Sequence, residues 1–176
     1  MSGSLFERFL KLAEREQRLA TGSSLFRLGD PILSLFVVTA GELRLVRALP
    51  HGTQLTLQRA RLASVLAEAS LFADRYQCDA LAVEESAVRA VPVAKVKAAL
   101  ERDPALTSAL LAHLAAEVHR TRMRAEMLSL KSVAMRVDAW MAFNDGVLPP
   151  KGCWHQLASE IGVTPEALYR ELARRR

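Results

Sequence analysis

The C-terminal segment EALYRELARRR carries side chains that could bind DNA. Arg170 could make a bidentate hydrogen bond to guanine, and Glu166 could accept a hydrogen bond from cytosine N4. The arginines that close the chain could hold phosphates. The side chains that we assign to DNA on these grounds are Thr164, Glu166, Tyr169, Arg170, Arg174 and Arg175, with Arg176 as a further phosphate contact.

Two short helices separated by a tight turn must position these side chains. The first helix is predicted to stop at Gly162, and the second begins at Pro165 behind a Thr164 cap. Leu168 and Leu172 form the apolar face of the second helix, away from the residues assigned to DNA. This is the sequence form of a helix-turn-helix, whose second helix enters the major groove. Any pair of amphipathic helices with a solvated basic end gives the same pattern, so the motif alone leaves both interpretations open.

A long helix is predicted before this unit, over residues 104–130. The segment has no glycine, and Pro104 suits the first helical turn behind an Asp103 N-cap. The stripe along it could pack on the chain's own β domain or pair with a second copy in a parallel homodimer. We favour the homodimer, because a helix of about 25 residues outgrows a small core. The stripe has the alternating spacing of three and four that is typical of a coiled coil, and consists of Leu111, Leu114, Val118, Thr121, Ala125 and Leu128.

The first half of the chain is predicted to be mainly β. Between Gln17 and about Val93, runs rich in Val, Leu, Thr and Phe are separated by the turn signals TGSS, LGDP, AGE and PHGT. The segments ELRLVRAL and TQLTLQRA alternate apolar and polar residues on either side of PHG, which predicts a hairpin. We therefore expect an α+β fold: an antiparallel β-roll, then the long helix, then an all-α C-terminal unit.

Composition and length narrow the functional classes. The 176 residues carry a formal net charge of +5, which weakly favours an anionic partner. No apolar stretch approaches the roughly 18–20 residues of a membrane helix, and the charged N-terminus lacks a signal peptide, so we expect a cytoplasmic protein. Two cysteines cannot build a disulfide framework or a four-cysteine metal site. We find no catalytic triad, phosphate loop or HExxH motif, and expect no enzyme.

The order of these parts resembles the Crp/Fnr family of bacterial transcription regulators. The resemblance is carried by LFRLGDPILSLFVVTAGELRLVR, AEASLF and WHQLASEIGVTPEALYRELARR, from about Leu25 onward. It implies a cyclic-nucleotide-binding-like jelly roll in residues 1–103, a dimerisation helix in 104–130 and a DNA-binding helix-turn-helix in 131–176. Members of this family act as homodimers on near-palindromic promoter sites. PEALYR matches the recognition helix, with Glu166 and Arg170 at the positions of the family's typical base readers.

The segment that resembles the effector site departs from the family pattern. In cyclic-AMP-responsive members, a Gly-Glu pair opens a short helix whose amides, with a following arginine, bind the cyclic phosphate, and the glutamate binds the ribose. Here Ala67 replaces the glycine, Cys78 replaces the arginine, and Asp79 would repel a phosphate. We therefore expect no response to cyclic AMP, although a different small effector could bind in the roll. The residues assigned to this pocket are Glu68, Ala69, Ser70, Arg75 and Cys78, with Arg75 as a substitute for the missing arginine.

No cofactor is predicted. The iron-sulfur members of the family need an N-terminal cysteine cluster, which this sequence lacks. Haem members use axial histidine or cysteine, but the candidates here are isolated residues, and we do not expect haem. These candidates are His51, His113, His119 and Cys78.

Family members usually continue past the recognition helix into a β-hairpin wing. The sequence stops at Arg176, so we expect a helix-turn-helix without a wing. The leading hypothesis is a homodimeric DNA-binding regulator. The alternative is an effector-sensing or protein-interaction module that no longer reads DNA.

Overall fold

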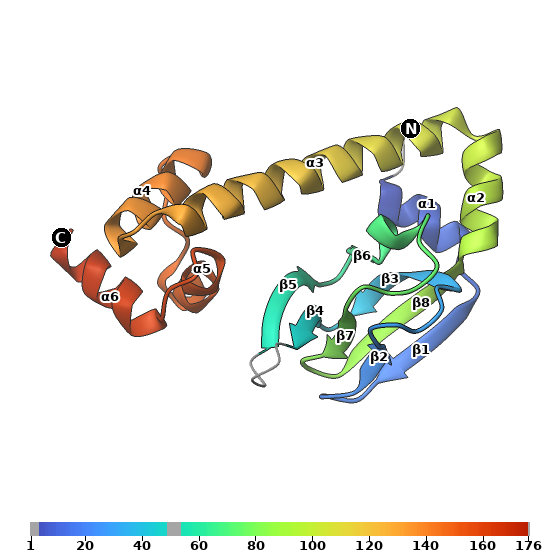
Figure 1. Cartoon of the computed structure of the whole chain (residues 1–176), viewed down its shortest axis with the longest axis horizontal. Coiled ribbons are helices and arrows are strands. Elements are labelled where there is room, and N and C mark those ends of the chain that lie inside the picture. The colour runs from blue at the N-terminus through green and yellow to red at the C-terminus, as the bar shows by residue number, and fades with distance from the viewer. Residues whose placement is uncertain (1–3, 49–53, 176) are drawn as a thin grey trace. The chain divides into compact units, whose positions relative to one another are not determined.

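The computed structural model describes residues 4–48 and 54–175 (Figure 1). The chain divides into two compact units, Met1–Leu114 and Ala115–Arg176, and the division falls inside the long helix. The elements of the first unit are α1 (Leu5–Leu12), β1 (Arg15–Leu19), β2 (Ser24–Phe26), β3 (Ser34–Ala40), β4 (Leu43–Ala48), β5 (Gln54–Ala60), β6 (Val65–Leu66), η1 (Glu68–Ser70), β7 (Asp79–Ala82), β8 (Ser86–Pro92) and α2 (Val93–Arg102). The helix α3 (Pro104–Ser129) spans the division, and α4 (Val133–Phe143), η2 (Lys151–Cys153), α5 (Trp154–Glu160) and α6 (Pro165–Arg174) follow it.

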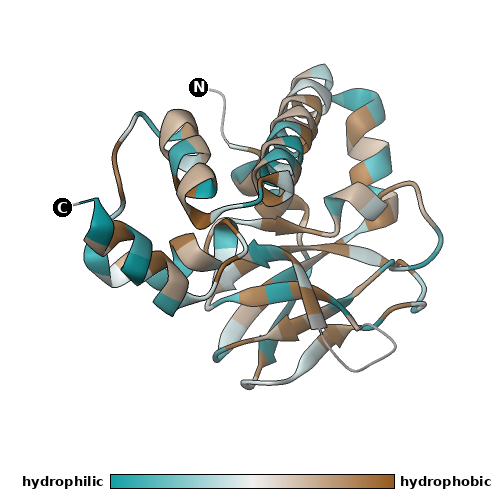
Figure 2. Ribbon diagram, turned by 60° about the vertical axis from the view of Figure 1, so that its left-hand side comes forward, coloured by the Kyte–Doolittle hydropathy of each residue, from teal (hydrophilic) through white to brown (hydrophobic). Residues whose placement is uncertain are grey.

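The strands form a roll of two four-stranded sheets, in the orders β1-β8-β3-β6 and β2-β7-β4-β5. Every strand pairing is antiparallel, which confirms the predicted sheet type. Hydropathy alternates along several strands (Figure 2). On β4, for example, Leu43 and Leu45 are buried, whereas Arg44 lies between them and pairs across the strands with Arg59 and Leu81. The predicted hairpin is β4–β5, although its turn lies outside the described residues.

Three helices complete the core of the first unit. Phe9 of α1, Val96 of α2 and Leu106 of α3 are buried in one cluster with the inner faces of the strands. The predicted Asp103 cap of α3 is confirmed, because its Oδ1 accepts hydrogen bonds from the amides of Ala105 and Leu106. The first part of α3 is thus fixed to the roll.

The second unit has its own apolar core. Met127 near the end of α3, Val137 of α4, Leu157 of α5 and Leu168 of α6 are buried together. Trp140 also belongs to this cluster. In Figure 2, α6 is coloured mostly as hydrophilic and carries some apolar bands. Within residues 4–48 and 54–175, no helix has both the length and the apolar composition required to cross a membrane.

Candidate functional site

The helices α5 and α6 are joined by a four-residue turn that includes Gly162. Gly162 has a φ of +66°, in the left-handed region that glycine favours. Thr164 caps α6, because its Oγ1 accepts a hydrogen bond from the amide of Ala167, 3.2 Å away. Pro165 occupies the first turn of α6. The cap and the proline therefore lie where the sequence places them.

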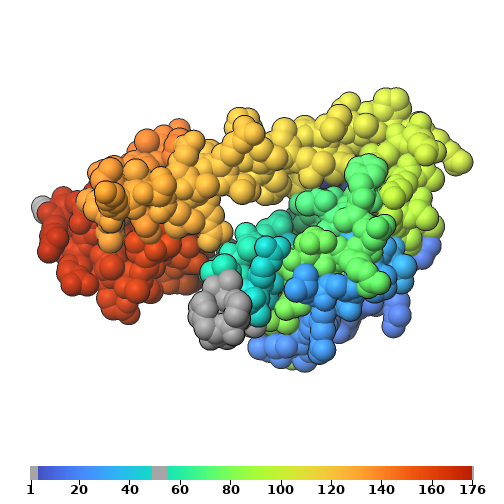
Figure 3. All heavy atoms as spheres, viewed as in Figure 1, coloured from blue at the N-terminus to red at the C-terminus, as the bar shows by residue number. Residues whose placement is uncertain are grey.

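The face of α6 opposite its core residues is exposed. Leu168 and Leu172 are buried, as their spacing indicates. Figure 3 shows the C-terminal segment, coloured red, at the surface of the second unit. All six residues of the predicted DNA set are exposed: Thr164, Glu166, Tyr169, Arg170, Arg174 and Arg175.

Glu166 is an ionised acceptor at neutral pH. Its carboxylate accepts hydrogen bonds from its own backbone N–H and from the Thr164 hydroxyl, and these bonds hold the pKa of Glu166 below its ordinary value. The charge lies in the first turn of α6, where the helix dipole favours a negative group. An ionised carboxylate is the form that can accept a hydrogen bond from a base amino group.

Tyr169 is held by an aromatic neighbour. Its ring lies against Trp154 of α5, with the centroids 5.3 Å apart and the rings tilted by 51°. Trp154 is in turn fixed by a hydrogen bond from its indole N–H to the carbonyl of Pro149. Tyr169 therefore presents its exposed edge from a defined position, a relationship between α5 and α6 that the sequence did not indicate.

Arg175 lies in a different environment from the other arginines of this segment. Its guanidinium donates to Asp138, to Glu171 and to the carbonyl of Ala134. The hydrogen bonds to Asp138 and Glu171 raise the pKa of Arg175 above its ordinary value. Arg175 thus joins the end of α6 to α4, while Arg176 lies outside the described residues.

The stripe predicted on α3 is largely exposed. Leu111 is 62% exposed and Val118 is 47% exposed, which is unusual for large aliphatic side chains in succession on one helix. Leu114 is partly buried against the core of the first unit. The remaining stripe residues Thr121, Ala125 and Leu128 are exposed.

The segment around η1 begins with a residue in an unusual backbone conformation. Ala67 precedes η1 with a φ of 66°, a left-handed conformation in which glycine carries no steric cost. The short helix bonds internally, because the amide of Ser70 donates to the carbonyl of Ala67. Ala69 between them is exposed.

Glu68 is the buried carboxylate of this segment, with only 5% of its surface exposed. Its Oε1 lies 3.1 Å from Nε2 of His113 on α3. His113 is one of the histidines treated as isolated in the sequence, and 45 residues separate it from Glu68. Their positions in the sequence therefore do not indicate that Glu68 and His113 are in contact.

The two other predicted effector residues have contacts within the roll. Arg75 donates to the carbonyl of Gly29 at 2.6 Å. Cys78 is packed against the core, and its burial raises the pKa of the thiol; nearby Arg47 lowers this pKa and Asp79 raises it further. The guanidinium of Arg75 is therefore bonded to backbone, and Cys78 carries no positive charge that could bind a phosphate.

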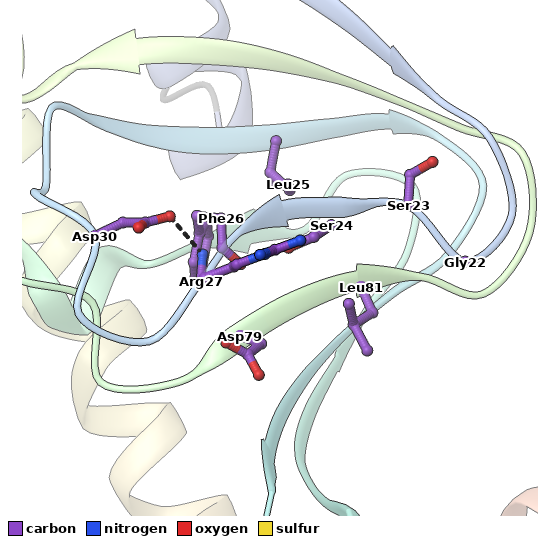
Figure 4. A pocket seen from close by; sticks show the side chains of 9 residues that line it. All are labelled: Gly22, Ser23, Ser24, Leu25, Phe26, Arg27, Asp30, Asp79 and Leu81. Carbon is purple, nitrogen blue, oxygen red and sulfur yellow. Dashed lines mark hydrogen bonds between the residues drawn. The ribbon is translucent and has the colours of Figure 1, made fainter.

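An open groove of about 560 Å³ lies elsewhere on the roll, along β2 and β7 (Figure 4). The carboxylates of Asp30 and Asp79 line this groove and are hydrogen-bonded to backbone amides. Asp30 accepts from the amide of Arg27, and Asp79 accepts from the amide of Leu28. The groove is lined by Gly22, Ser23, Ser24, Leu25, Phe26, Arg27, Asp30, Asp79 and Leu81, a set that is distinct from the predicted effector residues.

Residues 16–103, half of the chain, match the family model of the cyclic nucleotide-binding domain. The global nitrogen regulator of Synechococcus elongatus is 26% identical over 176 aligned residues, which cover 92% of this chain and 79% of that protein.

Solved structures share the fold. FixK2 from Bradyrhizobium japonicum superposes with a TM-score of 0.69 at 19% identity, covering 91% of this chain and 83% of that one. The c-di-GMP-responsive global regulator CLP of Xanthomonas campestris superposes with a TM-score of 0.67 at 20% identity, covering 97% and 89%. The resemblance in fold extends over both units of the chain.

Proposed function

Because this chain belongs to the cyclic nucleotide-binding domain family and its structural neighbours are transcriptional regulators of the Crp/Fnr type, we propose that it is a homodimeric, sequence-specific DNA-binding regulator that does not respond to cyclic AMP. The observation that carries this proposal is the exposed polar face of α6 behind a capped, glycine-containing turn. The pair α5–α6 acts as the helix-turn-helix, and α6 is its recognition helix.

The two kinds of DNA contact fall to different residues. Glu166 and Arg170, in the first two turns of α6, reach base edges, and Tyr169 supports them from its place against Trp154. Arg174, further along the helix, contacts phosphate. Arg175 contributes by holding α6 on α4, since its guanidinium is already engaged there.

A second copy of the chain covers the exposed stripe of α3. Apolar residues such as Leu111 and Val118 would be removed from water by a parallel partner helix. In such a dimer, two recognition helices meet half-sites about 34 Å apart, one turn of DNA.

The lack of response to cyclic AMP follows from the contacts around η1. The carboxylate of Glu68, which would bind a ribose, already contacts His113, and Cys78 supplies no positive charge for a phosphate. An effector of another chemical class remains compatible with the roll.

The test is selection of duplexes from a random pool, followed by fluorescence polarisation of a selected duplex and a scrambled one at several salt concentrations. We expect a near-palindromic site, tighter binding to it than to the scrambled duplex, and a steep fall of affinity with salt for both. Equal affinity for the two duplexes would contradict sequence-specific recognition. Isothermal titration with cyclic AMP should give no heat of binding.

A further inference from the structure

We propose that Arg136 is a positioning residue that fixes the recognition helix to the C-terminal end of α3 and so sets the spacing between half-sites that the protein accepts. This inference rests on the proposed function. It concerns only the second unit, Ala115–Arg176, in which the end of α3, α4, α5 and α6 share one core.

Arg136 of α4 donates four hydrogen bonds to backbone carbonyls at two separate places. Its Nη2 reaches the carbonyl of Leu128 at 3.0 Å and its Nε that of Leu130 at 2.9 Å, both at the end of α3. Its Nη1 reaches the carbonyls of Ile161 at 3.1 Å and Gly162 at 2.9 Å, both in the turn before α6. One rigid, planar group thus joins the end of the dimer helix to the turn that aims the recognition helix.

The acceptors explain why a guanidinium is suited to this position. The last carbonyls of an α-helix have no partner within the helix, and the helix dipole makes its C-terminal end negative. The acceptors of Arg136 lie at the ends of α3 and α5, so its charge stabilises two helix termini at once. Lysine carries a single ammonium group and cannot reach both ends in the same geometry.

Direct packing reinforces the same junction. A Cβ placed on Gly162 would lie 2.3 Å from Cδ2 of Leu128 and 3.4 Å from Nη1 of Arg136. The turn and the end of α3 are therefore in direct contact, and a side chain at position 162 would require Leu128 to move.

The far end of α6 is fastened to α4 as well. Arg175 bonds to Asp138 and to the carbonyl of Ala134, both on α4. Since α4 carries Arg136, it holds α6 near both ends and holds the end of α3. The recognition helix consequently follows the end of α3 as one body.

A rigid connection has a consequence for DNA recognition that a merely stabilising contact lacks. Inserting one base pair between half-sites moves them apart by about 3.4 Å and rotates them by about a tenth of a turn. A recognition helix fixed to α3 cannot follow this displacement, so affinity falls steeply. A recognition helix that swivels at the junction tolerates it.

The experiment compares the wild type with R136Q, R136K and the control K131Q, which removes an exposed positive charge from the same junction. Affinities are measured for palindromic duplexes whose spacers differ from the preferred length by one or two base pairs. We expect the wild type and K131Q to lose at least about tenfold per displaced base pair, and R136Q and R136K to lose less than about threefold. A uniform loss of affinity by R136Q, with an unchanged ranking of spacers, would overturn the inference.

A measurement without DNA separates this inference from the proposed function. Spin labels are attached to His119→Cys on α3 and Ala173→Cys on α6, both exposed positions, in a chain with Cys78 and Cys153 replaced by serine. The labelled chain is diluted into unlabelled chain so that each dimer holds one labelled protomer. The distance distribution should be narrow for the wild type and K131Q and broad for R136Q and R136K; equal widths would refute the rigid connection even if DNA binding proves specific. If the wild type shows no DNA preference, the proposed function fails. The distances between the spin labels still test whether α6 is rigidly connected to α3.

Discussion

Glu68 and His113 form a partly buried contact between η1 and α3, with Oε1 and Nε2 3.1 Å apart. The long helix α3 thereby supplies a partner to the carboxylate for which the resemblance to cyclic-AMP-responsive regulators implies a ribose contact. We expect H113A to lower the free energy of unfolding by about 1–2 kcal/mol, because the variant removes one hydrogen-bond donor from a buried carboxylate. H113Q, which keeps an N–H donor, should recover part of this loss in urea titrations. Equal stability of H113A and the wild type would show that the contact contributes nothing.

The division of labour on α6 predicts two distinguishable variants. R170A should lose about 1–3 kcal/mol of binding free energy on the preferred site and relax the preference at one base position. R174A should weaken binding to all duplexes alike and reduce the salt dependence by about one counterion. Polarisation titrations against single-base variants of the site measure both effects. Identical behaviour of the two variants would mean that the recognition face is assigned incorrectly.

The exposed stripe of α3 predicts a dimer that one charge can disrupt. V118E should raise the dimer dissociation constant by at least about tenfold, or about 1.4 kcal/mol, because it brings two carboxylates together on the seam. H119E carries the same charge one residue along, off the stripe, and should remain dimeric. Sedimentation velocity over a concentration series measures the difference. A dimer in V118E as stable as that in H119E would exclude this face.

Alanine variants of Gly162 and Gly146 separate two costs to stability: the clash of a new Cβ with Leu128, and the strain of alanine in the left-handed backbone region. Both have positive φ, +66° and +72°, but a Cβ meets a neighbour within 4 Å only at Gly162. Each alanine variant should lose about 1–2 kcal/mol from the left-handed backbone alone. G162A should lose more, since Leu128 must also move, and adding L128A should remove the excess. Thermal unfolding of the wild type, G146A, G162A and the double variant G162A/L128A tests this prediction. Equal stability of G162A and G146A would contradict it.

Glu42 predicts an acid-sensitive contribution to stability. Burial opposes its ionisation, but the hydrogen bond from Arg61 and the charges of Arg61, Arg59 and Arg44 outweigh that effect and hold the pKa of Glu42 below its ordinary value of 4.5. A lowered pKa in the folded state stabilises the protein above pH 4.5, and this stabilisation is lost as the pH falls through the folded value.

The control for this prediction is E42Q, which cannot ionise. The variant should be less stable than the wild type at pH 7, and the difference should shrink as the pH falls below 4.5. Urea midpoints measured between pH 3 and 7 would show it. A difference that stays constant over this range would exclude Glu42 as its source.

Local signals in the sequence predict elements well and long-range partners poorly. The alternation on β4, the Asp103 cap and the Thr164–Pro165 start of α6 are each properties of a few neighbouring residues, and each is present in the structure. His113 lies on the predicted long helix and Arg136 in the predicted all-α unit, but their partners are brought to them by tertiary packing.

The terminal arginines illustrate the same limit. The sequence assigns both Arg174 and Arg175 to DNA, yet the guanidinium of Arg175 donates to Asp138 and Glu171 within the unit. Which side of a helix is covered depends on α4, and no spacing within α6 specifies that neighbour.

The left-handed backbone conformation of Ala67, before η1, determines which residues this position accepts. Because Ala67 already holds the left-handed conformation that glycine favours, glycine can occupy position 67 without a change in the chain path into η1. A glycine at position 67 should therefore leave β6 in register with β3. The chemistry of this loop can thus be changed one side chain at a time on an unchanged backbone.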